Sequence, residues 1–144
     1  MKTYWGALVL VVMANAAFHI VQKSIPMQVH PLLSVMVTYT TGFIVCLLLL
    51  LLFPLTAPLS TEFSKLNWTS VALGVSIVGM EVGYLLMYRS GWPVSIGPIF
   101  TYALLTMLLV PIGLLLFKEK LAVQNYLGLF ITLIGVYLLT WKSS

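Results

Sequence analysis

The chain has 144 residues, of which 61% are hydrophobic and 7% charged, and its mean hydropathy is +1.10. Since an ordinary soluble domain carries about 25% charged residues, this composition excludes a water-soluble enzyme, a secreted disulfide scaffold and a disordered chain. The net charge of +4 is too small and too dispersed for nucleic-acid binding, and a single cysteine, Cys46, excludes an intrachain disulfide or a cysteine zinc cluster. The sequence therefore predicts a protein whose main partner is the lipid bilayer.

Five apolar segments of 18 to 24 residues follow one another along the chain. About 20 apolar residues cross the hydrocarbon core as a helix, and backbone groups in lipid must bond within their own segment. We therefore predict an all-α integral membrane protein with a single five-helix domain over 1–144. The transmembrane helices are expected at 5–22, 32–53, 70–88, 94–117 and 122–141.

The links between these segments have 9, 16, 5 and 4 residues. The shortest link, 118–121, predicts an antiparallel hairpin of the last two helices. The longest, 54–69, is amphipathic and is expected to lie along the membrane interface.

Five crossings divide the cationic residues between the N-terminal side, called side A, and the opposite side, called side B. Side A holds Lys2, Lys65, Lys118 and Lys120, and side B holds Lys23, Arg89 and Lys142. Orientation follows the asymmetry of Lys and Arg between short loops. Because side A holds four cationic residues and side B holds three, two possibilities stay open. The chain has one orientation with the N-terminus inside, or it inserts both ways up and pairs antiparallel.

Polar residues of the helices gather in their side B halves. They are Asn15, His19 and Gln22 in the first helix, Ser34, Thr38 and Thr41 in the second, Glu81, Tyr84 and Tyr88 in the third, and Ser95, Thr101 and Tyr102 in the fourth. The side A halves, at 6–13, 47–53 and 108–117, are almost wholly apolar. We therefore predict a cavity open towards side B and closed towards side A by packed aliphatic side chains.

Glu81 is the strongest single indication of function. A carboxylate near the bilayer centre costs about 2.5–3.5 kcal/mol even on the lenient insertion scale, and such residues usually face a cavity or a partner. We expect Glu81 to bind a cationic group or to carry a coupling proton. The alternative is a structural hydrogen bond to His19, Asn15 or a tyrosine hydroxyl. The expected substrate-binding residues are Glu81, Asn15, His19, Tyr84, Tyr88, Tyr102, Thr38 and Thr41, and for the two threonines a structural bond between helices is the alternative.

Small residues form two stripes. Gly79 and Gly83 make a GxxxG pair in the third helix, and Gly128, Thr132 and Gly135 share one face of the fifth. Such stripes permit close helix packing or dimerisation.

The last two helices carry a recognisable pattern: Pro93-Val-Ser-Ile-Gly-Pro98, an apolar run ending at Glu119, then Gln124 and the two glycines 128 and 135. This pattern resembles the closing hairpin of EamA-type members of the drug/metabolite transporter superfamily, and small multidrug resistance proteins are similar there. The resemblance implies half of a ten-helix inverted-repeat fold in the inner cell membrane. An unfused half implies an antiparallel homodimer.

The chain departs from small multidrug resistance proteins at one important point. Those proteins bind substrate and protons at a glutamate of the first helix, where this chain has Asn15. Their coupling mechanism therefore does not carry over to Glu81. Glu119 matches the family's acidic residue at the end of the fourth helix, where we expect it to bond local backbone groups.

Together these observations predict a homodimeric exporter or exchanger of a small organic solute, cationic or amphiphilic, acting by alternating access. No catalysis, cofactor or metal is expected. One alternative is a flippase for a lipid-linked substrate, for which Lys23 and Arg89 would be the candidate headgroup site. The other is a non-transporting accessory subunit.

Overall fold

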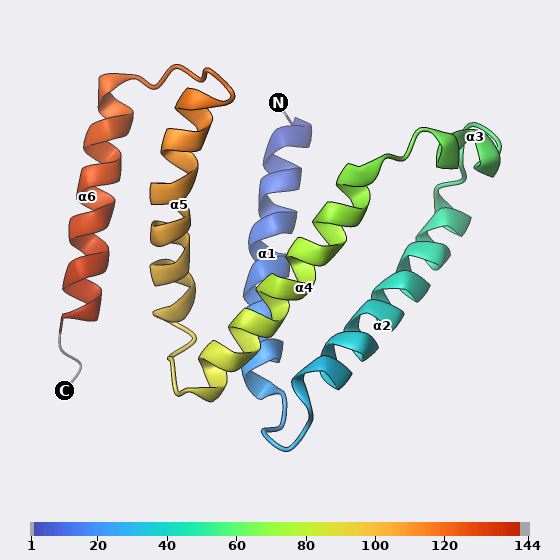
Figure 1. The fold of residues 1–144 in the computed structure, drawn as a ribbon, viewed down its shortest axis with the longest axis horizontal. Helices are drawn as coiled ribbons and strands as arrows, with labels where there is room; N and C mark the ends of the chain where they lie inside the picture. Colours follow the sequence, from blue (N-terminus) through green and yellow to red (C-terminus); the bar gives the residue numbers. More distant parts are fainter. Residues whose placement is uncertain (1, 142–144) are drawn as a thin grey trace. The chain divides into compact units, whose positions relative to one another are not determined.

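A computed structural model describes residues 2–141, which form six α-helices and no strand (Figure 1). Their bounds are α1 (Lys2–Ser24), α2 (Pro31–Leu52), α3 (Leu59–Ser64), α4 (Trp68–Arg89), α5 (Gly97–Leu115) and α6 (Val123–Thr140). The all-α prediction is thus confirmed for the described residues. Lys142, one of the cations assigned to side B, lies outside them.

Each of the five predicted segments coincides with a helix, with ends that differ by one to three residues. The amphipathic link additionally contains the short helix α3. At the start of α5, residues 94–96 form a turn rather than helix, because the N–H groups of Ile96 and Gly97 both bond to the Pro93 carbonyl.

Four helices, α1, α2, α4 and α5, are long and apolar enough to cross a membrane. The apolar part of α6, Val123–Leu139, is shorter. The described chain therefore has the helices of a membrane protein, while a fifth crossing by α6 is part of the proposal made below.

Local sequence explains where several helices begin and end. Asn67 caps α4, since its side-chain oxygen accepts the N–H of Thr69 at 2.9 Å. Pro31 opens α2 at the position where its missing N–H removes no helical bond. After α4 the chain turns at Gly91, whose φ of +100° is a conformation that side-chain-bearing residues rarely adopt.

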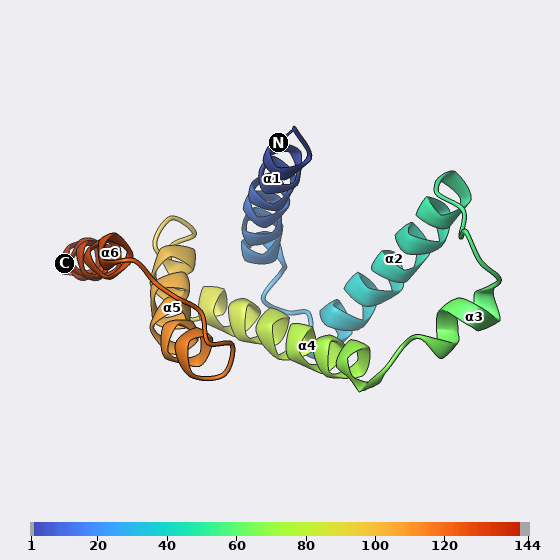
Figure 2. The same ribbon diagram turned by 90° about the horizontal axis from the view of Figure 1, so that it is seen from above.

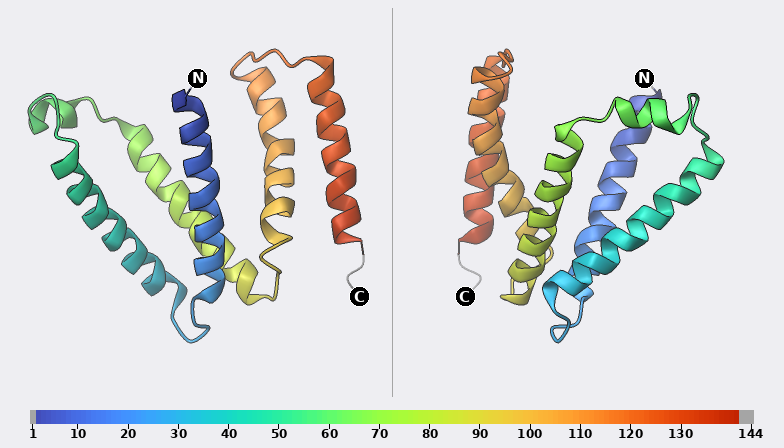
Figure 3. Two further views of the ribbon diagram at one scale, coloured as in Figure 1. Left: turned by 180° about the vertical axis from the view of Figure 1, so that it is seen from behind. Right: turned by 45° about the vertical axis from the view of Figure 1, so that its right-hand side comes forward.

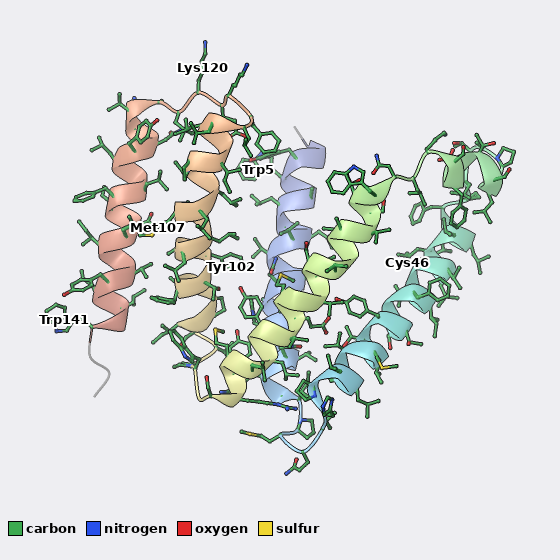
Figure 4. The ribbon with its side chains drawn as sticks, in the orientation of Figure 1. Trp5, Cys46, Tyr102, Met107, Lys120 and Trp141 are labelled. Carbon is green, nitrogen blue, oxygen red and sulfur yellow. The ribbon has the colours of Figure 1, made fainter. Side chains whose placement is uncertain are left out.

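The chain divides into two compact units: unit 1 ends at Ser90 and unit 2 begins at Gly91. In unit 1, α1 and α2 diverge from the loop over 25–30, and α4 contacts both of them (Figure 3). In unit 2, α5 and α6 form the predicted antiparallel hairpin, with Lys120 in its link and Trp141 at its open end (Figure 4).

Burial in unit 1 is confined to its side B half. Leu85 and Tyr88, near the end of α4, are 1% and 3% exposed, whereas Trp5, Leu51 and Val71 in the side A halves are all more than half exposed. Figure 2 shows α1 and α2 lying apart from each other on the same side of α4. The prediction that aliphatic side chains pack together at side A is therefore wrong within unit 1, because the helices diverge there.

The two small-residue stripes face open space within their own units. A Cβ built on Gly79, Gly83, Gly128 or Gly135 would meet no heavy atom within 4 Å. Thr132 donates its hydroxyl to the Gly128 carbonyl of its own helix at 2.8 Å. Contact of these stripes with a second copy of the chain stays a prediction.

Glu119 folds back on the end of α5. Its N–H donates to the Gly113 carbonyl at 3.0 Å, and a Cβ added to Gly113 would lie 2.6 Å from its Oε2. The residue before it, Lys118, has a φ of +51° that turns the chain at this point. The backbone of Glu119 thus bonds to the end of α5, while a bond from its carboxyl group to local backbone, the role expected from the sequence, stays a prediction.

Candidate functional site

Three buried polar residues of unit 1 come together where α1 crosses α4. Glu81, Gln22 and His19 are 4%, 4% and 5% exposed, in a chain whose large apolar side chains are mostly exposed. Gln22 and His19 belong to the side B half of α1, and Glu81 lies just beyond the middle of α4. The predicted site on these two helices is thus an internal feature of unit 1 and does not face lipid.

Hydrogen bonds of Gln22 and His19 join α1 to α4 at this level. The Gln22 amide donates from Nε2 to the backbone carbonyl of Glu81 at 2.8 Å. His19 Nδ1 and the Tyr88 hydroxyl share a hydrogen bond at 2.9 Å, in which the donor depends on the imidazole tautomer. Because both bonds lie in the part of the interface that excludes solvent, they fix how α1 is rotated against α4.

Aromatic rings form one wall of the site. The Tyr84 ring packs edge-on against His19, with centroids 4.7 Å apart, and it is stacked with Tyr88 at 6.2 Å. The Phe18 ring also packs edge-on against Tyr84, with 5.8 Å between the ring centroids. The structure thus brings together His19, Tyr84 and Tyr88, three of the residues that the sequence analysis assigns to one site.

The Glu81 carboxyl group faces α2. It interacts electrostatically with the hydroxyl of Tyr39, and that hydroxyl oxygen is buried, with a geometry that falls short of a regular hydrogen bond. α2 contacts α4 along this part of the fold. Glu81 is therefore enclosed by α1 on one side and by Tyr39 on the other.

The site also contains Tyr39 and Gln22. Neither residue is among those that the sequence analysis predicts to bind substrate. For Gln22 a signal existed, because it follows Asn15 and His19 at i+7 and i+3 on one face of α1. For Tyr39 there was none beyond a hydroxyl in an apolar helix, since its approach to Glu81 depends on how α2 crosses α4.

The other predicted site residues are placed differently. Asn15 is half-buried, and its amide donates to the Val11 carbonyl of its own helix at 3.1 Å. Thr38 and Thr41 are exposed and line a groove between α1 and α2, and Thr38 bonds within α2 to the Ser34 carbonyl. Tyr102 belongs to unit 2, where it is 43% exposed on α5.

Two cavities open in unit 1. One, of about 230 Å³, is lined by Gln22, Lys23, Ile25, Met27, Leu85, Tyr88 and Arg89. The other, of about 510 Å³, is the groove between α1 and α2. Neither of these two cavities is lined by Glu81 itself, but Gln22 and Tyr88 connect the smaller one to the polar cluster.

The chemistry available is that of binding and proton exchange. The cluster combines one carboxyl group, one imidazole, an amide and tyrosine hydroxyls, and the described residues contain no group of three or more His, Cys, Asp or Glu that could hold a metal ion. Comparison of the chain with protein-family models, with curated protein sequences and with solved structures finds no match.

Proposed function

We propose that this protein is a membrane transporter for a small organic solute that carries a cationic or amphiphilic group. The observation that carries the proposal is the buried Glu81, 4% exposed within a helix apolar enough to cross a membrane. A carboxyl group in such a helix costs several kcal/mol unless it is used or compensated. Its neighbours from two other helices, His19 and Gln22 of α1 and Tyr39 of α2, are polar groups able to accompany a bound cation or an exchanged proton.

The wall of rings suits the same class of substrate. Tyr84 and Tyr88 stack on each other three and seven residues after Glu81 in the same helix, and aromatic faces attract organic cations. In this proposal Glu81 is the residue that binds substrate and coupling proton in alternation, and the rings select for charge and apolar surface.

Alternating access requires that the site open to each side in turn, and two copies of the chain supply this by pairing. The resemblance of the last two helices to an unfused transporter half favours an antiparallel homodimer, with α6 as the fifth crossing. The open glycine stripes of α4 and α6 are surfaces on which a second copy can pack. We place the dimer in the inner cell membrane.

The test is uptake of labelled organic monocations into proteoliposomes made from purified protein, driven by a fixed pH gradient. We expect uptake by the wild type that Glu81→Gln abolishes. Glutamine keeps the size and hydrogen-bonding capacity of the side chain, so a purely structural role would survive the change. The matched control is Glu62→Gln, which alters the Glu62–Lys65 ion pair of α3 and leaves the site intact.

Other outcomes would favour the other functions. Uptake that is equal in the wild type and Glu81→Gln would reject Glu81 as the coupling residue. Movement of labelled lipid without solute movement would favour a flippase, and an inactive protein that co-purifies with a different chain would favour an accessory subunit. A tag at the C-terminus, scored for its exposure on each face of the membrane, tests the antiparallel dimer: a single orientation would reject it.

A further inference from the structure

The smaller cavity of unit 1 brings two cationic side chains together where α1 and α4 end. Lys23 lies in the last turn of α1 and Arg89 is the last residue of α4. Both line the cavity of about 230 Å³, called here the cationic cavity. Among the residues that the structure describes, no carboxylate is paired with Arg89, since the ion pair found there joins Lys65 and Glu62.

Arg89 is held firmly but is not neutralised. Its Nη2 donates to the backbone carbonyls of Val29 at 2.6 Å and Pro26 at 3.1 Å, while its Nε is buried without a partner. Carbonyl dipoles orient a guanidinium but do not cancel its charge. The fork of N–H donors in arginine matches the oxygens of a phosphate, so this side chain is preorganised for an anion.

Lys23 adds a second positive charge to the same cavity. Its Nζ donates to the Tyr88 carbonyl at 3.0 Å and lies 5.7 Å from the centre of the Tyr88 ring. These contacts direct the ammonium group to the end of α4, beside Arg89. The cationic cavity therefore carries two charges at the end of membrane-type helices, a position at which lipid headgroups lie.

An apolar groove adjoins the cationic cavity. It has a volume of about 510 Å³, and Ile25 lines both spaces. Its lining is mostly apolar and includes Val21, Leu33 and Val37. Along α2 it runs from Leu33 to Thr41, about 12 Å at 1.5 Å per residue, which is most of one leaflet of a hydrocarbon core about 30 Å thick.

We propose that this end of unit 1 binds an anionic phospholipid of the surrounding bilayer, with its phosphate between Lys23 and Arg89 and an acyl chain in the apolar groove. Basic pockets between transmembrane helices are a general way of binding anionic headgroups. A lipid is favoured over free phosphate because the cationic cavity continues into a groove of acyl-chain length. Glu81 lines neither space, so the lipid site does not depend on the proposed transport function.

The test measures lipid binding to the full-length purified protein by native mass spectrometry, with phosphatidylglycerol and phosphatidylcholine of identical chains titrated in competition. We expect phosphatidylglycerol to bind more tightly to the wild type. In the double variant Lys23→Gln, Arg89→Gln this preference should fall about thirtyfold, since each cation near the surface contributes about 1 kcal/mol and 1.4 kcal/mol corresponds to tenfold. The matched control, Lys65→Gln, removes an exposed cation that directly follows α3 and should keep the preference.

If the double variant fails to fold, the wild type and single variants still test the lipid site. The wild type alone gives the ratio of the two lipids, and equal binding would overturn the proposal. Lys23→Gln, which leaves the Arg89 contacts to the loop intact, should lower the preference by itself. Val37→Trp should block the groove and weaken both lipids. Inorganic phosphate that binds as tightly as phosphatidylglycerol would identify a free anion as the ligand and overturn the lipid site.

Discussion

The hydrogen bond between Tyr88 and His19 is the sharpest test of how α1 and α4 are joined. Tyr88→Phe removes one hydroxyl and keeps the ring, so the stack on Tyr84 and the approach of Lys23 to the ring are retained. Both partners are at most 5% exposed, and the bond length is 2.9 Å. The variant therefore leaves a buried imidazole nitrogen of His19 without the Tyr88 hydroxyl.

The magnitude follows from this burial. Hydrogen bonds between membrane helices contribute about 0.6 kcal/mol on average and up to about 1.7, and an orphaned buried polar group costs about 1–3 kcal/mol. We expect Tyr88→Phe to lower the free energy of unfolding by about 1–2 kcal/mol, a change of fivefold or more in the unfolding equilibrium.

The assay is equilibrium unfolding in mixed detergent micelles, run as a double-mutant cycle. Tyr88→Phe is combined with His19→Leu, and the coupling energy should lie near 0.6–1.7 kcal/mol. Tyr126→Phe, which removes an exposed hydroxyl from α6, is the matched control and should change little. Additive effects of the two substitutions, or equal losses from Tyr88→Phe and Tyr126→Phe, would refute the geometry of the α1–α4 contact.

Two further predictions concern the backbone and use the same assay. Asn67→Ala removes the cap of α4 and should lower stability by about 1 kcal/mol; Asn67→Ser, which can still cap, should restore most of it. Gly91→Ala places a side chain at a φ of +100° and should cost about 1–2 kcal/mol, whereas Gly74→Ala, in the interior of α4 with no atom within 4 Å, should stabilise by about 1 kcal/mol. Changes of the same sign in the free energy of unfolding for Gly91→Ala and Gly74→Ala would contradict the assigned backbone conformations.

Part of the candidate site could be predicted from sequence because it depends on helical periodicity. Residues three, four and seven apart share a face, so His19 was expected beside the face of Glu81, Tyr84 and Tyr88. Periodicity does not state which face of α2 meets α4. For that reason Tyr39 was missed, and Thr38 and Thr41 were placed with Glu81 although they line the groove between α1 and α2.

The sequence by itself determined that the surroundings of the chain are lipid and where its helices lie. In lipid, an apolar run of about 20 residues must form all its backbone hydrogen bonds within itself. This requirement is local. Composition, together with the Pro, Asn and Gly residues that mark helix ends, therefore located the helices to within a few residues. Only the tertiary structure decided which side chains meet. The divergence of α1 from α2, the burial of Gln22 against the Glu81 carbonyl and the meeting of Lys23 with Arg89 depend on how the helices cross and rotate. These are properties of contacts between distant segments, which local sequence does not encode.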